Sequence, residues 1–525
     1  MIQQFQVTTH FITRMRTMRN MTAHLGLPSQ QWPFKSLLLS SQPCSSLHTT
    51  RKVEEDEGEW LWPADWGSQL YHHCNLRGTR KGTFGITINT AMPILPSHLN
   101  QAFTHLCRQL PILQIVMKLQ EDTPWFFRRS TPMPNFQFVE DEGSLDDICN
   151  KVSEQNFTYN DLAFWRAWVV PRGPDVPCPM PELRTSLPHQ YDVAMSIHHG
   201  LGDGLDAGLV TKCLIDILSK ILSGQSVDDT PLGIINNKDD VKILKEKVRQ
   251  KLLVDPERID VVRRTLPPPQ HKPLLLQIAP KPGISKSSTE TVSRTLHKEV
   301  VTNFKQWVKD TGITYNSGLV AAVNTALVEL AIAEGFKQDT FNIMLGMNIT
   351  IRRYLPKSSV YRFGPYNTNL SLPSSVRRDV KENFWEYARQ LHHDLMTGIK
   401  SGLALEQEVV RNLGQPLLSP EETAALPQPH VHDFAISNLG DISAGLTAES
   451  NHLQVTNVLS TNVIHNWFWS NLQIICTYRG QTYYSLCYDT QYLTHDTASR
   501  FLDQIVSVVK EVSGTKASPT LRSKM

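Results

Sequence analysis

The sequence predicts an α/β protein that is built from two domains of similar size. Apolar residues alternate with a period of about two in several short segments and recur at helical spacing in the segments between them, which is typical of strands that alternate with helices. A chain of 525 residues is longer than one ordinary domain. A proline-rich stretch at 266–287 interrupts both patterns near the middle of the chain and indicates an extended linker.

These boundaries divide the chain into five parts. They are a basic leader (1–55), an N-terminal domain (56–265), the linker (266–287), a C-terminal domain (288–515) and a short tail (516–525). The leader contains no Asp or Glu before Glu54, and its Arg and Lys residues lie among many Ser and Thr residues. This composition is typical of a mitochondrial transit peptide and also of a disordered tail. We therefore expect a cytoplasmic protein, with a mitochondrial address as the alternative.

In the N-terminal half, short alternating runs and longer periodic segments follow one another. A helix at 99–110 is ended by Pro111, and a strand at 191–197 follows a long proline-rich loop and ends at a pair of histidines. The expected elements are strands at 85–90, 162–170 and 191–197 and helices at 99–110 and 209–221.

The C-terminal half repeats this alternation. A charged helical segment at 238–264 precedes the linker, and Arg479 and Gly480 are expected at the turn of a late hairpin. The expected elements are strands at 291–296 and 341–349 and helices at 301–311, 316–333, 381–398 and 494–512.

Composition excludes several classes of function. Lys and Arg number 52 against 50 Asp and Glu, so the chain carries no excess of positive charge for a nucleic acid. No uninterrupted apolar run reaches the length of about 18 to 20 residues that a membrane-spanning helix needs. The eight cysteines include no Cys-x-x-Cys pair, which argues against a zinc ribbon and a dense disulfide framework and favours a reducing compartment. We expect a monomer without a transmembrane segment.

The most informative segment lies between the strand at 191–197 and the helix at 209–221. It contains His198 and His199, followed by Asp203 between Gly202 and Gly204. An imidazole at a strand end can act as a general base near neutral pH. The acid four residues later can return toward the ring or toward an arginine. The glycines allow positive φ and let backbone N–H groups approach a substrate carbonyl. The alternative is a pair of loop histidines without a chemical role.

The same glycines do not fit a nucleotide loop. A Rossmann fingerprint needs a differently spaced third glycine and an acidic strand end about 20 residues later, and neither is present. No Walker motif occurs in the sequence.

The segment His198-His-Gly-Leu-Gly-Asp203-Gly resembles the HHxxxDG motif of the CoA-dependent acyltransferase superfamily. This superfamily includes nonribosomal peptide condensation domains, alcohol acetyltransferases and polyketide-associated acyltransferases. Further segments resemble family motifs in the same order along the chain. They are FTHLCRQLPIL (103–113), DLAFWRA (161–167), GITYNSGLV (312–320), TIRRYL (350–355) and FAISNLG (434–440).

The resemblance implies two chloramphenicol-acetyltransferase-like α/β domains that meet in a V around a central channel. His199 would be the general base, and His198 would support it. Asp203 would be structural and paired with an arginine, for which Arg352 is the first candidate and Arg166 the second. The same resemblance places Ser437 and Asn438 at the channel, where they would help hold the oxyanion; a purely turn-forming Asn438 is the alternative.

The implied activity is transfer of an acyl group from acyl-CoA, or from an acyl-carrier thioester, to an alcohol in a ternary complex. It needs no bound cofactor, no metal and no covalent acyl-enzyme. An amine acceptor and a non-catalytic binding protein of the same fold are alternatives. The DFGWG motif of the BAHD branch is absent, and Gln114 stands where condensation domains carry an arginine. These departures favour a free-standing transferase. Thr350 and Pro365 also depart from the residues that other branches often hold, so the branch stays open.

Two other clusters could be drawn as metal ligands, at 72–74 and 430–433, but their spacing favours solvated loops. The aromatic run at 467–469 favours sheet packing over an acyl pocket.

Overall fold

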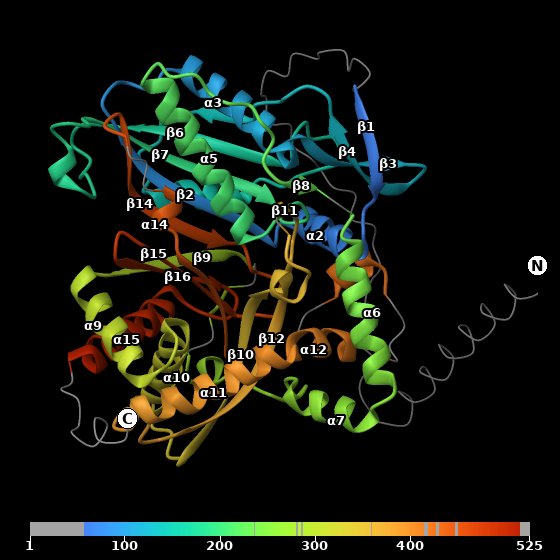
Figure 1. Ribbon diagram of the computed structural model, residues 1–525. Coiled ribbons are helices and arrows are strands. Elements are labelled where there is room, and N and C mark those ends of the chain that lie inside the picture. The colour runs from blue at the N-terminus through green and yellow to red at the C-terminus, as the bar shows by residue number, and fades with distance from the viewer. Residues whose placement is uncertain are drawn as a thin grey trace, which may run out of the picture. The chain divides into compact units, whose positions relative to one another are not determined.

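The computed structural model describes residues 57–514, apart from 236, 280–281, 285–286, 359, 414–417, 427–429 and 447–449. The described chain is organised around two large sheets (Figure 1). The first has the strand order β14-β2-β7-β6-β5. Its strands are β14 (Leu453–Asn462), β2 (Lys81–Thr90), β7 (His189–His198), β6 (Trp165–Arg172) and β5 (Phe136–Phe138).

The second sheet has six strands in the order β12-β10-β13-β15-β16-β9. Its strands are β12 (Asn367–Arg377), β10 (Thr340–Thr350), β13 (Phe434–Asp441), β15 (Asn471–Tyr478), β16 (Gln481–Asp489) and β9 (Thr289–Leu296). Strand β13 pairs in parallel with both of its neighbours, and the other pairs are antiparallel. Two small sheets join β1 (Gly58–Pro63), β4 (Thr123–Arg129) and β3 (Ile115–Gln120), and β8 (Ile234–Ile235) with β11 (Arg362–Phe363).

Helices cover both faces of the first sheet because its strands are apolar on both sides. In β7, Val193 and Met195 pack in one core with α3 (Pro96–Gln109) and α5 (Gly204–Leu222). Ala194, which points the other way, packs with α4 (Leu145–Glu154). The two-sided burial fixes the register of β7 and therefore the position at which the chain turns into α5.

The second sheet has its own core, to which several helices contribute. Helix α10 (Tyr315–Ala333) lies at its centre and is buried nearly all round. Among the described helices it is the one long and apolar enough to cross a membrane, and 72% of its most apolar window is buried inside the protein. The helices around it are α8 (Leu274–Ile278), α9 (Lys298–Thr311), α11 (Phe384–Ser401), α12 (Leu403–Asn412) and α15 (His495–Gly514).

Most of the predicted elements are present, with shifted ends. The hairpin turns at Arg479 and Gly480, whose φ values are 49° and 77°. The charged segment at 238–264 forms two helices, because Pro256 starts a new helix after Asp255 caps it. These are α6 (Asp239–Leu253) and α7 (Pro256–Thr265). The predicted extended linker contains the short helix α8, whose Leu274 and Leu275 are buried in the second core.

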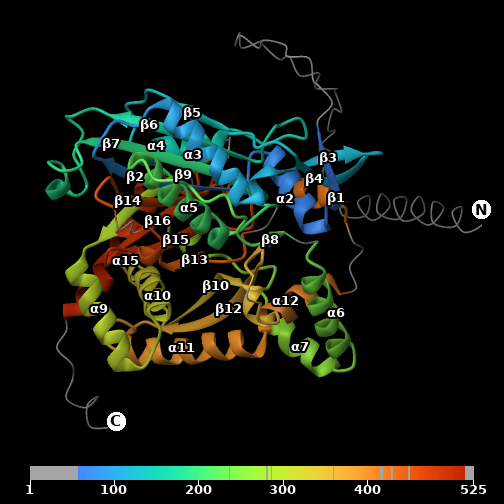
Figure 2. The same cartoon turned by 45° about the horizontal axis from the view of Figure 1, so that its top comes forward.

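Segments from the C-terminal half complete the N-terminal half. Strand β14 pairs with β2 along its whole length and forms an edge of the first sheet (Figures 1 and 2). Strand β11, also from the C-terminal half, pairs in parallel with β8 in a separate two-stranded sheet. The division at 266–287 and the V-shaped arrangement stay predictions, but the first sheet itself is built from both halves of the chain. The leader (1–55) and the tail (516–525) lie outside the described residues.

Candidate active site

The site is organised around the turn that joins β7 to α5. Asp203 caps α5: its carboxylate accepts hydrogen bonds from the backbone N–H groups of Leu205 and Asp206, at 3.0 and 3.4 Å. The carboxylate of Asp206 returns the contact and accepts from the N–H of Asp203 at 2.9 Å. This reciprocal capping box fixes the turn directly after the two histidines.

The glycines of the turn are needed for close packing. A Cβ atom at Gly200 would lie 2.9 Å from the ring of His198, one at Gly202 would lie 2.9 Å from the side chain of Asp206, and one at Gly204 would lie 2.7 Å from Leu439. None of the three has a positive φ. The expectation that these glycines supply a left-handed backbone is therefore wrong. Glycine is needed at these positions because a side chain would have no space.

His198 is buried and holds the turn from inside. Its Nδ1 accepts a hydrogen bond from the N–H of Gly200 at 3.0 Å, so the ring hydrogen lies on Nε2, which is 3.2 Å from Nδ1 of His72. The ring also stacks on Phe164 at 4.7 Å. Burial holds the pKa of His198 well below its ordinary value, and the ring is neutral. These contacts fix the ring inside the turn, and its supporting role toward His199 stays a prediction.

His199 lies in the wall of a cavity and stacks face to face on Tyr71, with ring centroids 4.4 Å apart and 9° between the planes. Its Nδ1 is enclosed, which leaves Nε2 as the nitrogen that can reach the cavity. Burial lowers the pKa of His199, and the charge of Arg80 lowers it further, against the raising effects of nearby backbone groups and of Asp203. The ring is therefore neutral near pH 7 and can accept a proton.

The ion pair predicted between Asp203 and Arg352 is present and joins the two halves of the chain. Arg352 also contacts Asp206 at 3.1 Å and donates to the carbonyl of Gly364 at 3.1 Å. The N–H of Tyr366 donates to Asp203 at 3.2 Å. The carboxylate of Asp203 is thus committed to Arg352 and to backbone groups, as a structural residue would be.

The second predicted partner, Arg166, is not near Asp203. It forms an ion pair with Asp161 at 3.6 Å and donates to Gln155 and to the carbonyl of Asn156, at 2.8 and 3.0 Å. As a partner for Asp203, Arg166 was the wrong choice, because β6 directs it toward the loop after α4.

Asp206 is the acid that the sequence analysis missed. Besides Arg352 and the N–H of Asp203, it accepts from Tyr361 at 2.8 Å and from the N–H of Gly364 at 3.2 Å. Burial and the neighbouring Asp203 raise the pKa of Asp206 to about 7. Its spacing from Asp203 is that of a capping box, and this spacing is the signal that could have identified it.

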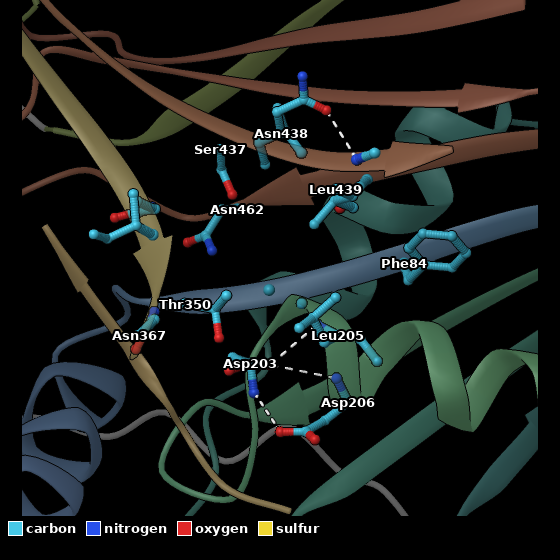
Figure 3. A pocket seen from close by; sticks show the side chains of 18 of the residues that line it. Phe84, Asp203, Leu205, Asp206, Thr350, Asn367, Ser437, Asn438, Leu439 and Asn462 are labelled. Atoms are coloured by element: carbon cyan, nitrogen blue, oxygen red, sulfur yellow. Dashed lines mark hydrogen bonds between the residues drawn. The ribbon is translucent and has the colours of Figure 1, made fainter. Parts of the chain in front are cut away.

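The cavity beside His199 has a volume of about 580 Å³ and is lined by both halves of the chain. Figure 3 shows Phe84, Leu205 and Leu439 on one side of it, and Ser437, Asn462 and Asn367 on the other. Strand β14 supplies Asn462 to this wall because its residue 462 pairs with Gly82 of β2, next to Ile197 at the end of β7. The cavity therefore has an apolar side and a polar side with neutral hydrogen-bonding groups, and Lys305, Arg353 and Asp441 also line it.

The two residues predicted to hold the oxyanion both line the cavity, in different states. Asn438 donates to Asn316 at 3.0 Å and accepts from the N–H of Gly440 at 2.8 Å, which is the turn-forming arrangement. The hydroxyl of Ser437 makes no hydrogen bond with any described residue. Their role toward an oxyanion stays a prediction, and Ser437 is the one with a free donor.

The other histidine clusters are buried instead of lying in solvated loops. His72 faces His198 from α2 (Trp66–Leu76), and His432 contacts the hydroxyl of Ser371 at 2.9 Å. Trp467 and Trp469 pack in a buried cluster with Leu472, as expected for structural aromatic residues.

Solved structures share this architecture over most of their length. The condensation domain of the Monacolin K polyketide synthase MokA matches with a TM-score of 0.61 at 12% identity, covering 87% of this chain and 98% of that chain. The TRI3 trichothecene 15-O-acetyltransferase from Fusarium sporotrichioides matches with a TM-score of 0.60 at 10% identity, covering 86% and 95%. Polyketide synthase associated protein 5 from Mycobacterium tuberculosis matches with a TM-score of 0.57 at 11% identity, covering 87% and 99%.

The chain has the condensation-domain fold. The α/β class and the two acetyltransferase-like lobes predicted from the motif are confirmed at this level. Family profiles and curated protein sequences give no match to the chain. The similarity to these structures is therefore one of fold.

Proposed function

We propose that the protein is an acyltransferase that moves an acyl group from a thioester, with acyl-CoA as the co-substrate, to the hydroxyl group of a small acceptor. The observation that carries this proposal is a neutral His199 in the wall of a cavity that both halves of the chain enclose. A general base needs a free ring nitrogen beside the space where substrates meet, and His199 satisfies this requirement.

In the proposed reaction, Nε2 of His199 takes the proton of the acceptor hydroxyl while its oxygen attacks the thioester carbonyl carbon. The tetrahedral intermediate then collapses, the carbon–sulfur bond breaks, and the thiolate recovers the proton from His199. Base catalysis of this kind contributes about 10² to 10⁴ in rate. Holding the two substrates together and stabilising the oxyanion, for which Ser437 is the candidate donor, would supply the remainder.

The two sides of the cavity suggest how the substrates divide between them. Phe84 and Leu205 suit an apolar acyl chain, and Ser437 and Asn462 suit an uncharged acceptor that forms hydrogen bonds. Asp203 and Asp206 line the same cavity and are paired with Arg352. The neutral hydrogen-bonding groups beside His199 therefore suit the hydroxyl group of an acceptor, and the charge that the rest of the acceptor carries is left to the substrate panel.

The test is an incubation of the purified full chain with acyl-CoA donors of increasing chain length and a panel of neutral and charged alcohols and amines. Release of free thiol that depends on the acceptor, with an ester detected by mass spectrometry, supports the proposal. An amide as the main product would show that the acceptor is an amine and not an alcohol. Failure of the whole panel, with no thioester bound, would contradict the enzyme assignment and favour a binding protein.

A further inference from the structure

A tyrosine and an arginine outside the motif are built against the proposed base. Tyr71, on α2, covers one face of the His199 ring at 4.4 Å. Asn367 of β12, from the C-terminal half of the chain, interacts with the Tyr71 hydroxyl and lowers its pKa against the larger raising effect of burial. With 9° between the planes, the Tyr71 ring lies flat on the His199 ring and limits its freedom to tilt.

Arg80 lies on this stack. Its guanidinium carbon is 4.8 Å from the centre of the Tyr71 ring and 3.1 Å from the centre of the Trp467 ring. Its backbone has a φ of 56°, a conformation that residues other than glycine seldom adopt. Such a conformation persists where the surrounding structure requires it and is found preferentially at functional sites.

The charge of Arg80 has no acidic partner in the part of the chain that the structure describes. Its side chain forms no ion pair and no hydrogen bond with any described residue, whereas Arg352 contacts both Asp203 and Asp206. The two stacking distances place the guanidinium within about 9 Å of the His199 ring. An uncompensated cation at this range disfavours a second positive charge on the imidazole.

The other charged and titratable groups near His199 do not replace this effect. Tyr71 is neutral because burial raises the pKa of its phenol, and His198 is neutral for the corresponding reason. Asp203 favours a protonated His199 but is paired with Arg352. Burial is the largest cause that keeps a proton off the ring, and the charge of Arg80 adds to it.

We propose that Tyr71 and Arg80, supported by Trp467, are positioning residues that fix the plane of the His199 ring and keep it unprotonated so that it can act as a base. The inference adds these residues to the proposed function and rests on it for their catalytic meaning. The physical effect on the ring exists whether or not the chain transfers an acyl group.

The decisive experiment is an NMR titration of the histidine rings in the full chain, with the His199 signal assigned by its loss in His199→Ala. Removing the charge in Arg80→Gln should raise the pKa of His199 by about half a unit to one unit. Arg80→Lys should keep most of the wild-type value, because the charge remains. Arg77 is an exposed arginine three residues before Arg80, directly after α2. Arg77→Gln is therefore the matched control and should leave the pKa of His199 unchanged. An unchanged pKa of His199 in Arg80→Gln overturns the proposal.

Three further variants separate the charge of Arg80 from its packing and test the stacked ring of Tyr71. Arg80→Met removes the charge but retains packing on Trp467, and it replaces Arg80→Gln if the latter is unstable. In active protein, the acid limb of the kcat/KM profile should move to higher pH in the charge-removing variants. Tyr71→Leu removes the stacked ring and should lower kcat at constant acceptor KM, and Tyr71→Phe, which keeps the ring, should lower kcat less. If no acyl transfer is found, the proposed function fails, and the titration alone still decides whether Arg80 controls the ring.

Discussion

Replacing Arg352 by Met is the perturbation with the clearest structural consequence. The arginine fork holds two carboxylates, those of Asp203 and Asp206, and donates to the carbonyls of Arg362 and Gly364 at 3.2 and 3.1 Å. Methionine retains much of the volume and removes the charge and every hydrogen bond. Two carboxylates would then face each other without a cation.

The magnitude follows from burial. The side chains of Asp203 and Asp206 are 6% and 4% exposed, and that of Arg352 is 19% exposed. Removing one partner of a buried ion pair costs about 3 to 5 kcal/mol, and the partial exposure of Arg352 places this site near the lower end, at about 3 kcal/mol. Arg352→Lys keeps the charge but loses the bidentate fork, and the one or two hydrogen bonds lost with it should cost about 1 to 2 kcal/mol. Adding Asp206→Asn to Arg352→Met removes one of the two stranded charges and should recover part of the loss.

The assay is urea unfolding, followed by tryptophan fluorescence and by far-ultraviolet circular dichroism. Coincident curves show that one transition is being measured, and the change in midpoint at constant slope then gives the loss of stability. If Arg352→Met unfolds within about 1 kcal/mol of wild type, or if Asp206→Asn makes the variant worse, the ion pair does not hold the turn to the C-terminal half in the way described here.

Three further predictions concern the same cavity. Because the pKa of Asp206 is raised, the folded protein still binds a proton between about pH 4 and 7 that the unfolded chain has lost, so this group makes stability fall as pH rises through that window. Asp206→Asn should flatten this fall when the free energy of unfolding is measured against pH. An unchanged slope would contradict the raised pKa of Asp206. Leu205→Trp should fill the apolar side and reduce kcat/KM for long acyl donors by about tenfold more than for acetyl donors, whereas an equal loss for all lengths would refute the location of the acyl chain. Asn462→Ala should raise the acceptor KM about three- to tenfold, as the loss of one neutral hydrogen bond does, and an effect on the thioester KM instead would assign this residue to the donor.

Local sequence was enough to predict the turn but not its surroundings. His198, His199 and Asp203 lie in one short segment between a period-two strand and a helix, so their roles could be predicted. Asp206 carries the spacing of a capping box and could have been recognised in the same segment. The prediction of a left-handed backbone at the glycines was wrong, because the sequence does not distinguish a glycine needed for a positive φ from one needed where a side chain has no space.

The rest of the site depends on contacts that local patterns do not encode. Asn462 reaches the cavity because β14 leaves its own half and pairs with β2, and Tyr71 and Arg80 reach His199 through the packing of α2 against the turn. Such contacts depend on which buried faces fit together in the folded chain. The residues that meet are more than a hundred positions apart in the sequence, so local propensities do not predict them. The burial of His72 and His432 was missed for the same reason.

The central claim is that His199 is the base for acyl transfer, and the turnover of His199→Ala tests it most directly. The measurement is acceptor-dependent ester formation at saturating thioester, with wild type and variant matched for thermal stability. We expect a loss of about 10² to 10⁴ in kcat with little change in the KM of either substrate. Undiminished turnover in His199→Ala would contradict the role of His199 as the base.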